Sequence, residues 1–206
     1  MRAAALFARR DSIYKTMPEL DVYDIERDAR SFRGGLPVIA HPPCRAWGRL
    51  RWNAKPLPGE KELALFAVEQ VRKYGGVLEH PEASALWDAA GLPRPDPERI
   101  TRDEYGGWTL AIAQLWFGHR AEKRTWLYIV GIEPADIPDF PLFLGEATHV
   151  IAAPCRRANG YRPKKGDPEW RPEVTDAERE HTPARLAEWL VDLVSRIAPA
   201  GGKVLS

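Results

Sequence analysis

Short apolar runs, each stopped by charge, glycine or proline, are the dominant pattern along this chain. Runs of this kind predict strands that are buried in a sheet. The aromatic and β-branched run Thr125–Ile132 is the strongest strand signal, and the proline that follows it limits its length. We expect further strands at Ala3–Ala8, Asp21–Ile25, Pro37–His41, Val77–Glu79 and Ala147–Ala152.

Other segments show helical periodicity. Between Glu60 and Tyr74 the apolar residues recur at spacings of three and four and share one face, namely Leu63, Phe66, Ala67, Val71 and Tyr74. Thr182-Pro183 is an N-cap and first-turn pair that opens a helix to about Ile197. The residues of that helix expected to face the core are Leu186, Leu190, Leu193, Val194 and Ile197. Shorter helices are predicted at Ser84–Ala90 and Trp108–Phe117.

The order of these elements favours an α/β fold. The helix Glu60–Tyr74 lies between two predicted strands, which is typical of a parallel pair joined by a right-handed crossover. We therefore predict a three-layer α/β fold with a mostly parallel sheet. The chain has 206 residues and no internal repeat, so we expect residues 1–206 to form a single domain.

Composition narrows the classes of function. The formal net charge of +1 argues against general binding of polyanions, so contacts to nucleic acid must come from local basic patches. No apolar stretch is long enough to span a bilayer, and the apolar run near the N-terminus is too short for a signal peptide. The two cysteines give no disulfide framework. These features predict a cytoplasmic protein with reduced thiols and no membrane partner.

The segment Val38–Leu50 holds the first candidate for chemistry. Its apolar run ends at Pro42-Pro43, and Cys44 follows at once. Ligands of open α/β sheets bind beyond the carboxyl ends of the strands, which is where this stiff turn would hold the thiol. A lone cysteine after a strand is also often a small buried hydrophobe, so both interpretations stay open.

Cations and tryptophans are interleaved after this cysteine, without an acid among them. The residues are Arg45, Trp47, Arg49, Arg51, Trp52 and Lys55. Such a composition suits a loop that contacts phosphates and bases. The alternative is an ordinary protein interface, where arginine and tryptophan are also enriched.

Three fragments follow one another at the ends of predicted strands. They are Pro42-Pro43-Cys44, then Leu78-Glu79-His80-Pro81, then Phe117-Gly118 with Lys123-Arg124-Thr125 and Ile129-Val130-Gly131. In this order the chain resembles the DNA (cytosine-5-)methyltransferases, as a truncated phage or prophage-type relative. The stretch Glu79–Trp87 is similar to a Glu-Asn-Pro variant of phage-type members, and the helix that starts at Thr182-Pro183 is similar in placement to the last block of the family.

The resemblance implies a reduced S-adenosylmethionine-methyltransferase-like (Rossmann-like) fold without a separate target-recognition domain. It also implies that Cys44 adds to C6 of a cytosine, so that C5 becomes nucleophilic. Glu79, with a pKa raised by a tight pocket, would act as the acid at N3, and Arg124 would stabilise charge. The target base would be flipped out, with Trp47 in the vacated stack. Pairing of Glu79 with a loop arginine is the alternative for that carboxylate.

The methyl donor implied by the resemblance is S-adenosylmethionine. Its contacts would come from Phe7, Asp24, Glu26 and Pro42, with the acids after the second strand meeting a ribose. Members of the family carry a glycine-rich loop after the first strand, whereas Phe7–Ser12 contains no glycine. The acidic residues Asp24, Glu26 and Asp28 are equally explained as a solvated strand end.

The remaining candidates have ordinary alternatives. Arg156 and Arg157, in the basic loop up to Arg171, are expected to bind DNA in place of a recognition domain, although a solvated loop is more common. Cys155 is best explained as a loop cysteine. His41, Cys44 and His80 lack the fourth ligand of a structural zinc site, so no metal is predicted.

The hypothesis from sequence is therefore C5 modification of a pyrimidine, most simply methyl transfer to cytosine in DNA, or the same chemistry on a pyrimidine nucleotide. One alternative is a catalytically inactive, methyltransferase-like protein that binds nucleic acid. The other is a C5-pyrimidine enzyme whose donor is not S-adenosylmethionine. If the gene is phage-borne, the protein works in the host cytoplasm.

Overall fold

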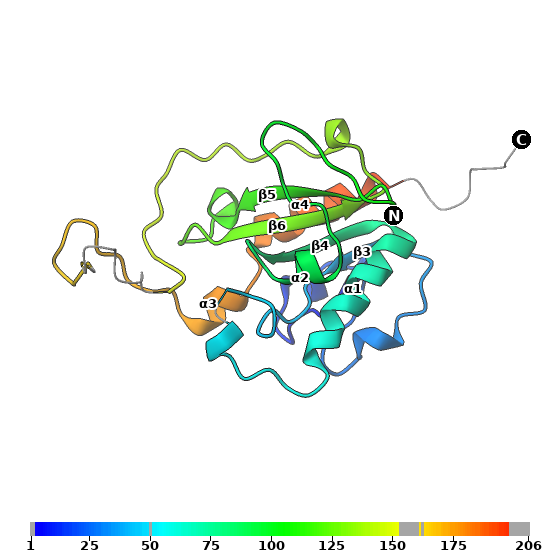
Figure 1. Ribbon diagram of the computed structural model, residues 1–206, viewed down its shortest axis with the longest axis horizontal. Coiled ribbons are helices and arrows are strands. Elements are labelled where there is room, and N and C mark those ends of the chain that lie inside the picture. The colour runs from blue at the N-terminus through cyan, green and yellow to red at the C-terminus, as the bar shows by residue number, and fades with distance from the viewer. Residues whose placement is uncertain (1–2, 50, 153–160, 162, 198–206) are drawn as a thin grey trace, which may run out of the picture.

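The computed structural model describes residues 3–49, 51–152, 161 and 163–197 of the chain. Its centre is a six-stranded mixed sheet with the strand order β2-β1-β3-β4-β6-β5 (Figure 1). The pairs β1–β2, β1–β3 and β3–β4 are parallel, whereas β6 is antiparallel to both β4 and β5. The strands are β1 Ala3–Leu6, β2 Leu20–Val22, β3 Val38–Ala40, β4 Gly76–Pro81, β5 Trp108–Ala113 and β6 Arg124–Val130.

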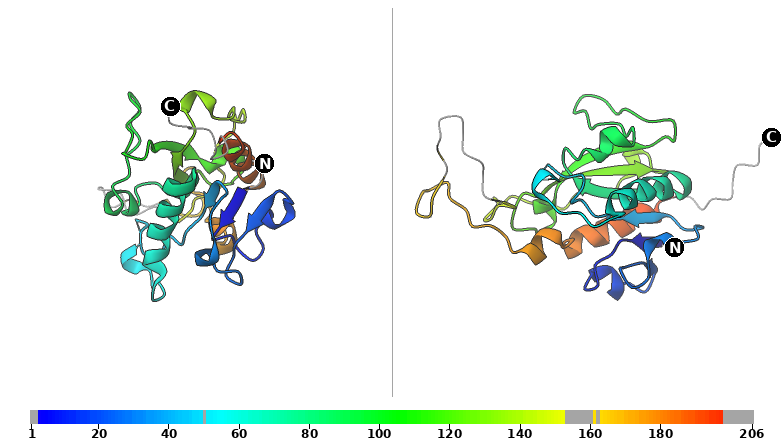
Figure 2. Two further views of the ribbon diagram at one scale, coloured as in Figure 1. Left: turned by 90° about the vertical axis from the view of Figure 1, so that its right-hand side faces the viewer. Right: turned by 60° about the horizontal axis from the view of Figure 1, so that its bottom comes forward.

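Helices cover both faces of this sheet, which gives three layers (Figures 1 and 2). The long helix α1 (Glu60–Tyr74) and the short α2 (Leu86–Ala89) lie on one face, and α4 (Ala184–Ser195) packs on the other. A short helix α3 (Asp176–Glu180) precedes α4. The predicted α/β class is confirmed. The short 3₁₀ segments are η1 Ile13–Thr16, η2 Ala29–Ser31, η3 Arg51–Asn53, η4 Gln114–Phe117 and η5 Pro134–Asp136.

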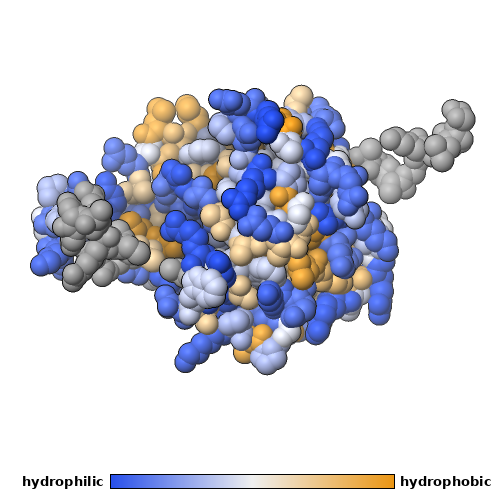
Figure 3. Space-filling model, in the orientation of Figure 1, coloured by the Kyte–Doolittle hydropathy of each residue, from blue (hydrophilic) through white to orange (hydrophobic). Residues whose placement is uncertain are grey.

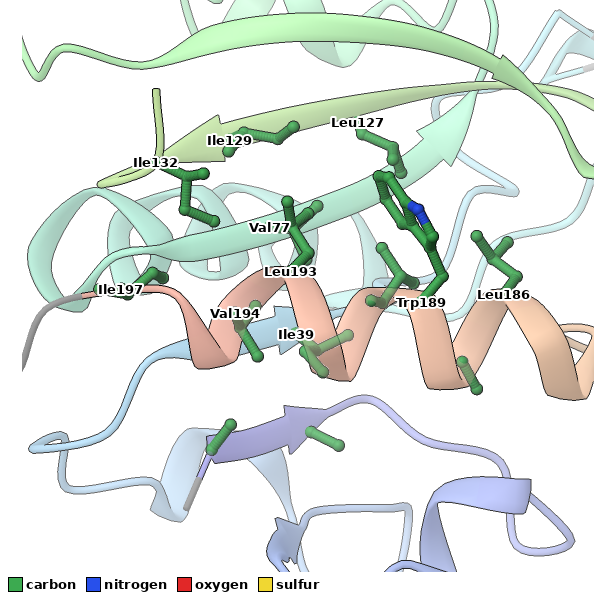
Figure 4. Packing of buried hydrophobic residues seen from close by; sticks show 14 of the residues in the cluster. Ile39, Val77, Leu127, Ile129, Ile132, Leu186, Trp189, Leu193, Val194 and Ile197 are labelled. Carbon is green, nitrogen blue, oxygen red and sulfur yellow. The ribbon is translucent and has the colours of Figure 1, made fainter. Parts of the chain in front are cut away.

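One apolar core lies between α4 and the sheet (Figure 4). Leu186, Leu190 and Leu193 of the helix are fully buried and face Ile39 of β3 and Val77 of β4. The core-facing residues predicted for this helix are all buried. Its start differs from the prediction, because Pro183 and not Thr182 is the N-cap, and no side chain caps the helix.

The other core lies under α1. Ala67 and Val71 are buried as predicted, while Leu63, Phe66 and Tyr74 are only partly buried. The small residues on α1 allow the helix to pack closely on β3 and β4.

The close approach of β4 to β3 requires a glycine at Gly76. A Cβ atom built on this residue would lie 2.0 Å from the Val38 carbonyl oxygen, and its φ of +133° disfavours other residues. The glycine therefore permits β4 to pair with β3 directly after the helix.

Trp108–Phe117 is not a helix, and that prediction is wrong. Its first part is strand β5, which pairs antiparallel with β6 along its whole length, and only Gln114–Phe117 forms a single 3₁₀ turn. A short apolar run fits either a buried helix or a buried strand, and the partner strand decides between them. The resulting hairpin makes the sheet mixed.

The predicted strand Ala147–Ala152 is also wrong. Within the described residues this segment forms isolated bridges only, between Ala121 and His149 and between Val150 and Glu173. It lies outside the sheet, where no edge strand offers it a continuous partner.

No helix in the described part of the chain is long and apolar enough to cross a membrane. Most of the face that carries α1 is hydrophilic, and apolar side chains gather over the loop after β6 (Figure 3). Leu142 and Leu144 of this loop are 85% and 90% exposed.

A pair of leucine variants tests the packing of α4. Leu190→Ala removes a fully buried side chain from the core and should lower the free energy of unfolding by about 2–5 kcal/mol. Leu144→Ala makes the same chemical change at an exposed position and should change it by less than about 0.5 kcal/mol. Urea unfolding followed by circular dichroism measures both. Equal effects of the two substitutions would contradict the burial of this face of α4.

Candidate functional site

Three chain segments meet at one end of the sheet, beyond the carboxyl ends of its parallel strands. The carboxyl ends of the parallel strands β3 and β4 point to this end, and the antiparallel β6 begins there, with Thr125 opposite Pro81. As a result, the residue after β3, the inward-facing residue of β4 and the residue before β6 come together. These residues are His41, Glu79 and Lys123.

Glu79 is held by neighbours on both of its oxygens. Its Oε2 lies 3.0 Å from His41 Nδ1, and Gln114 Nε2 donates to its Oε1 at 3.1 Å. Burial would raise the pKa of this carboxyl, but the His41 hydrogen bond and the charges of His41 and Lys123 outweigh it and hold the pKa at about 2. The expectation of a raised pKa is therefore wrong. The partner of the carboxylate is a histidine and not a loop arginine.

His41 has a second partner on its other nitrogen. The Tyr14 hydroxyl lies 2.8 Å from His41 Nε2, and the two rings are 5.4 Å apart. Tyr14 comes from η1 and is 1% exposed. Burial and the charge of Glu79 raise its pKa well above the ordinary value of 10.0, so it stays a phenol. No pattern in the sequence points to Tyr14, and His41 stands out there only as a possible metal ligand.

Cys44 lies on the turn beyond β3, where part of it reaches solvent. Its carbonyl oxygen accepts hydrogen bonds from Trp47 N and Gly48 N at 3.0 and 2.8 Å, which closes the turn. Although the residue is exposed, the protein around the thiol removes enough water to raise its pKa above 9.0. Glu79 adds to this rise, and the charge of Lys123 opposes it.

Lys123, and not Arg124, is the cation at the site. Lys123 stands just before β6 with a φ of +37°, whereas Arg124 is the first residue of the strand. Lys123 Nζ donates to the His181 carbonyl oxygen at 2.9 Å, and burial lowers the pKa of the lysine. Arg124 is exposed and pairs with Glu122 at 3.0 Å. The structure thus does not bring Arg124, predicted as a catalytic residue, to Cys44.

Trp47 and Arg45 hold the loop through contacts to α1. Trp47 is 4% exposed, and its Nε1 donates to the Lys61 carbonyl oxygen at 3.0 Å. It therefore does not fill the space left by a flipped base. Arg45 makes two hydrogen bonds to the buried Glu60 carboxylate, at 2.9 and 2.8 Å.

The other residues predicted to contact nucleic acid differ in their exposure and in their contacts. Arg49 is exposed. The guanidinium of Arg51 lies 4.6 Å from the ring centre of Trp52, a side chain that is 82% exposed. This pair offers a cation and an aromatic face to a ligand. Arg156 and Arg157, like Cys155, lie outside the described residues.

The four predicted cofactor residues do not line one cavity. Phe7 lines a cavity of about 250 Å³ together with Arg9, Tyr14, His41 and Glu180. Asp24 and Glu26 line a different, open depression along β2. Pro42 lies buried at the end of β3 and lines neither of them.

The acidic residues after β2 already have partners. Asp24 pairs with Lys15 and accepts hydrogen bonds from Glu26 N and Arg27 N at 2.8 and 2.9 Å. These contacts, the Lys15 hydrogen bond first, lower its pKa to about 2. Glu26 is exposed and lies 3.5 Å from Arg10.

S-adenosylmethionine does not fit the described residues. The cavity beside Phe7 is smaller than the roughly 300–1,000 Å³ of typical small-molecule sites. Phe7 has a φ of +63°. Glycine adopts this conformation without strain, as in a glycine-rich loop, whereas here a residue with a large side chain occupies it. Arg9 pairs with Glu180 across this cavity. No step is therefore derived through this cofactor.

His80 is a fully buried histidine on the other face of β4, and neither ring nitrogen has a hydrogen-bond partner among the residues that the structure describes. Its ring packs 6.4 Å from that of Trp87. Burial lowers its pKa to about 4, although Glu79 and the Pro43 carbonyl act in the opposite direction. Among the described residues, no three histidine, cysteine, aspartate or glutamate side chains are grouped to hold a metal ion.

His80 should make the protein sensitive to acid. Its pKa is about 4 when folded, against an ordinary 6.5, so the folded state binds fewer protons and loses stability as the pH falls below 6.5. Between pH 8 and pH 5 this loss is about 2 kcal/mol. Urea unfolding at both pH values should show the full loss in the wild-type protein and in His149→Leu, and a much smaller one in His80→Leu, where His119, whose pKa burial also lowers, still contributes. An equal loss in His80→Leu would contradict the assignment.

The charges around Cys44 predict opposite effects on thiol reactivity. In a Cys155→Ser background, Glu79→Gln removes a negative charge and should speed alkylation of Cys44 by iodoacetamide at pH 8 by about three- to tenfold. Lys123→Gln should slow alkylation by a similar factor. Intact mass spectrometry follows the reaction. Changes in the same direction would show that these charges do not control the thiol.

No protein-family model, no curated protein and no solved structure matches the chain. Its function is therefore argued from the geometry of these side chains and from the sequence fragments that surround them.

Proposed function

We propose that this protein activates C5 of a pyrimidine, most simply cytosine in DNA, by adding the Cys44 thiolate to C6. The observation that supports this most is the meeting of a thiol, a carboxylate and an ammonium group at the ends of β3, β4 and β6. These groups come from the three sequence fragments that resemble the DNA (cytosine-5-)methyltransferases. The proposed fold is a reduced form of the methyltransferase-like, Rossmann-like sheet.

Each group has a part in the addition. The Cys44 sulfur forms a bond to C6, and the electron pair displaced from the ring collects at N3, which takes up a proton. Glu79 acts at N3, and Lys123 favours the thiolate over the thiol. The enamine that results is nucleophilic at C5. This addition needs no second reactant.

The substrate must bring its base out of a stack to reach Cys44. The exposed Arg49 and the Arg51–Trp52 pair follow the cysteine in the same loop and suit a phosphate backbone and a base face. This is why we favour DNA over a free nucleotide. A cytoplasmic location, in the host cell if the gene is phage-borne, is part of the proposal.

Methyl transfer is the C5 reaction that the resemblance implies. Since the described residues do not fit S-adenosylmethionine, the proposal also includes a donor of another kind. The small cavity beside Phe7 and the existing partners of Asp24 favour this second form. A non-catalytic protein that binds nucleic acid is the remaining alternative, and it requires no reactive thiol.

Covalent trapping tests the addition by itself. Single- and double-stranded oligonucleotides that contain zebularine should form an adduct with the wild-type protein without any donor, seen by intact mass. Cys44→Ala should form no adduct, and Cys155→Ser should react like the wild type. An oligonucleotide with 5-fluorocytosine, tested with and without S-adenosylmethionine, shows whether that cofactor completes the reaction.

The outcomes separate the alternatives. A zebularine adduct that needs Cys44, with no capture of 5-fluorocytosine, supports the addition and a different donor. Capture of 5-fluorocytosine that needs S-adenosylmethionine supports methyl transfer. No adduct with either probe contradicts the proposal, and DNA binding that is unaffected by Cys44→Ser and falls steeply with salt would then favour the binding protein.

A further inference from the structure

We propose that His41 is a positioning residue that stores the proton which Glu79 passes to the pyrimidine, with Tyr14 holding the imidazole in place. This inference rests on the proposed function and concerns the proton that the addition needs. It assigns a role to two residues that no sequence fragment of the resemblance contains.

The geometry places the imidazole between two oxygen atoms. His41 Nδ1 lies 3.0 Å from Glu79 Oε2, and His41 Nε2 lies 2.8 Å from the Tyr14 hydroxyl. Side-chain exposure is 11% for His41 and 14% for Glu79, so little water competes for these contacts. Such an arrangement, in which a base is oriented by a carboxylate and contacts a third group, is typical of proton-transfer sites.

Glu79 needs a proton source because it is ionised. With a pKa of about 2, the carboxyl holds almost no proton at neutral pH. Gln114 donates to its other oxygen and favours the ionised form further. A carboxylate in this state cannot protonate N3 unless a neighbour supplies the proton, and His41 is hydrogen-bonded to it.

The transfer balances within the site. The protonated imidazole donates from Nδ1 to Glu79 and from Nε2 to the Tyr14 oxygen. When the Cys44 sulfur bonds to C6, N3 takes a proton from Glu79, and Glu79 takes the Nδ1 proton of His41. His41 is left neutral and still donates from Nε2 to Tyr14. When the adduct reverses, the sulfur–carbon bond breaks and the proton returns along the same path.

The other charged groups nearby do not replace His41. Lys123 Nζ is engaged by the His181 carbonyl oxygen, and its charge is needed near the thiol. His80 lies on the opposite face of β4 without a hydrogen-bond partner. The remaining charged and titratable groups that face this part of the molecule are Arg9, Asp11, Glu180 and His181 of the adjoining cavity, and Cys44 itself.

The rate of zebularine adduct formation against pH tests the role. The wild-type rate depends on both thiolate and protonated His41. Rising pH supplies thiolate and depletes the proton that the step needs, so these opposing demands should keep the wild-type rate nearly level between about pH 7 and 8.5. In His41→Gln the rate should be about a hundredfold lower at pH 7 and should rise about tenfold per pH unit. His149→Gln is the matched control and should keep the level profile.

Each result decides one question. No adduct with the wild-type protein overturns the proposed function itself. An adduct in the wild type with an unchanged, level profile in His41→Gln overturns only the role of His41. Should His41→Gln fail to fold, Tyr14→Phe replaces it, because loss of the hydroxyl removes the acceptor for Nε2. That variant should react several-fold more slowly at pH 7, and a wild-type rate would overturn the inference.

Discussion

The buried, ionised carboxylate of Glu79, near the carboxyl ends of β3 and β4, constrains which side chains can surround it. Glu79 stays charged among protein atoms because His41, Gln114 and Lys123 surround it with donors and positive charge. These partners come from the end of β3, the end of β5 and the start of β6. The antiparallel hairpin is therefore as necessary to the site as the parallel strands, because it delivers the amide and the ammonium group.

The same packing limits what else binds at this end of the sheet. Tyr14 fills the space behind His41, and Arg9 pairs with Glu180 across the remaining cavity of about 250 Å³. Side chains thus occupy the region in which a glycine-rich loop would leave room for a methyl donor. This favours the form of the proposed function in which Cys44 adds to the ring and the donor is not the one implied by the resemblance.

The loop that follows Cys44 is held in place near its start and is exposed farther along. Trp47 anchors it to α1, and Arg45 holds the buried Glu60. These contacts keep the turn at Cys44 in place. They are made within the protein and involve no stacking on a substrate. Farther along the loop, the Trp52 side chain is exposed enough to contact a base.

The local elements can be predicted from the sequence alone, because helical periodicity and proline-terminated runs are properties of neighbouring residues. The helix Glu60–Tyr74 and the strand beside Cys44 were predicted on that basis. Two features depend on distant partners and therefore on the tertiary structure: the pairing of β5 with β6 in place of a helix at Trp108, and the position of Lys123, rather than Arg124, at the site. The pKa of Glu79 also depends on the tertiary structure, since it is set by side chains far away in the chain.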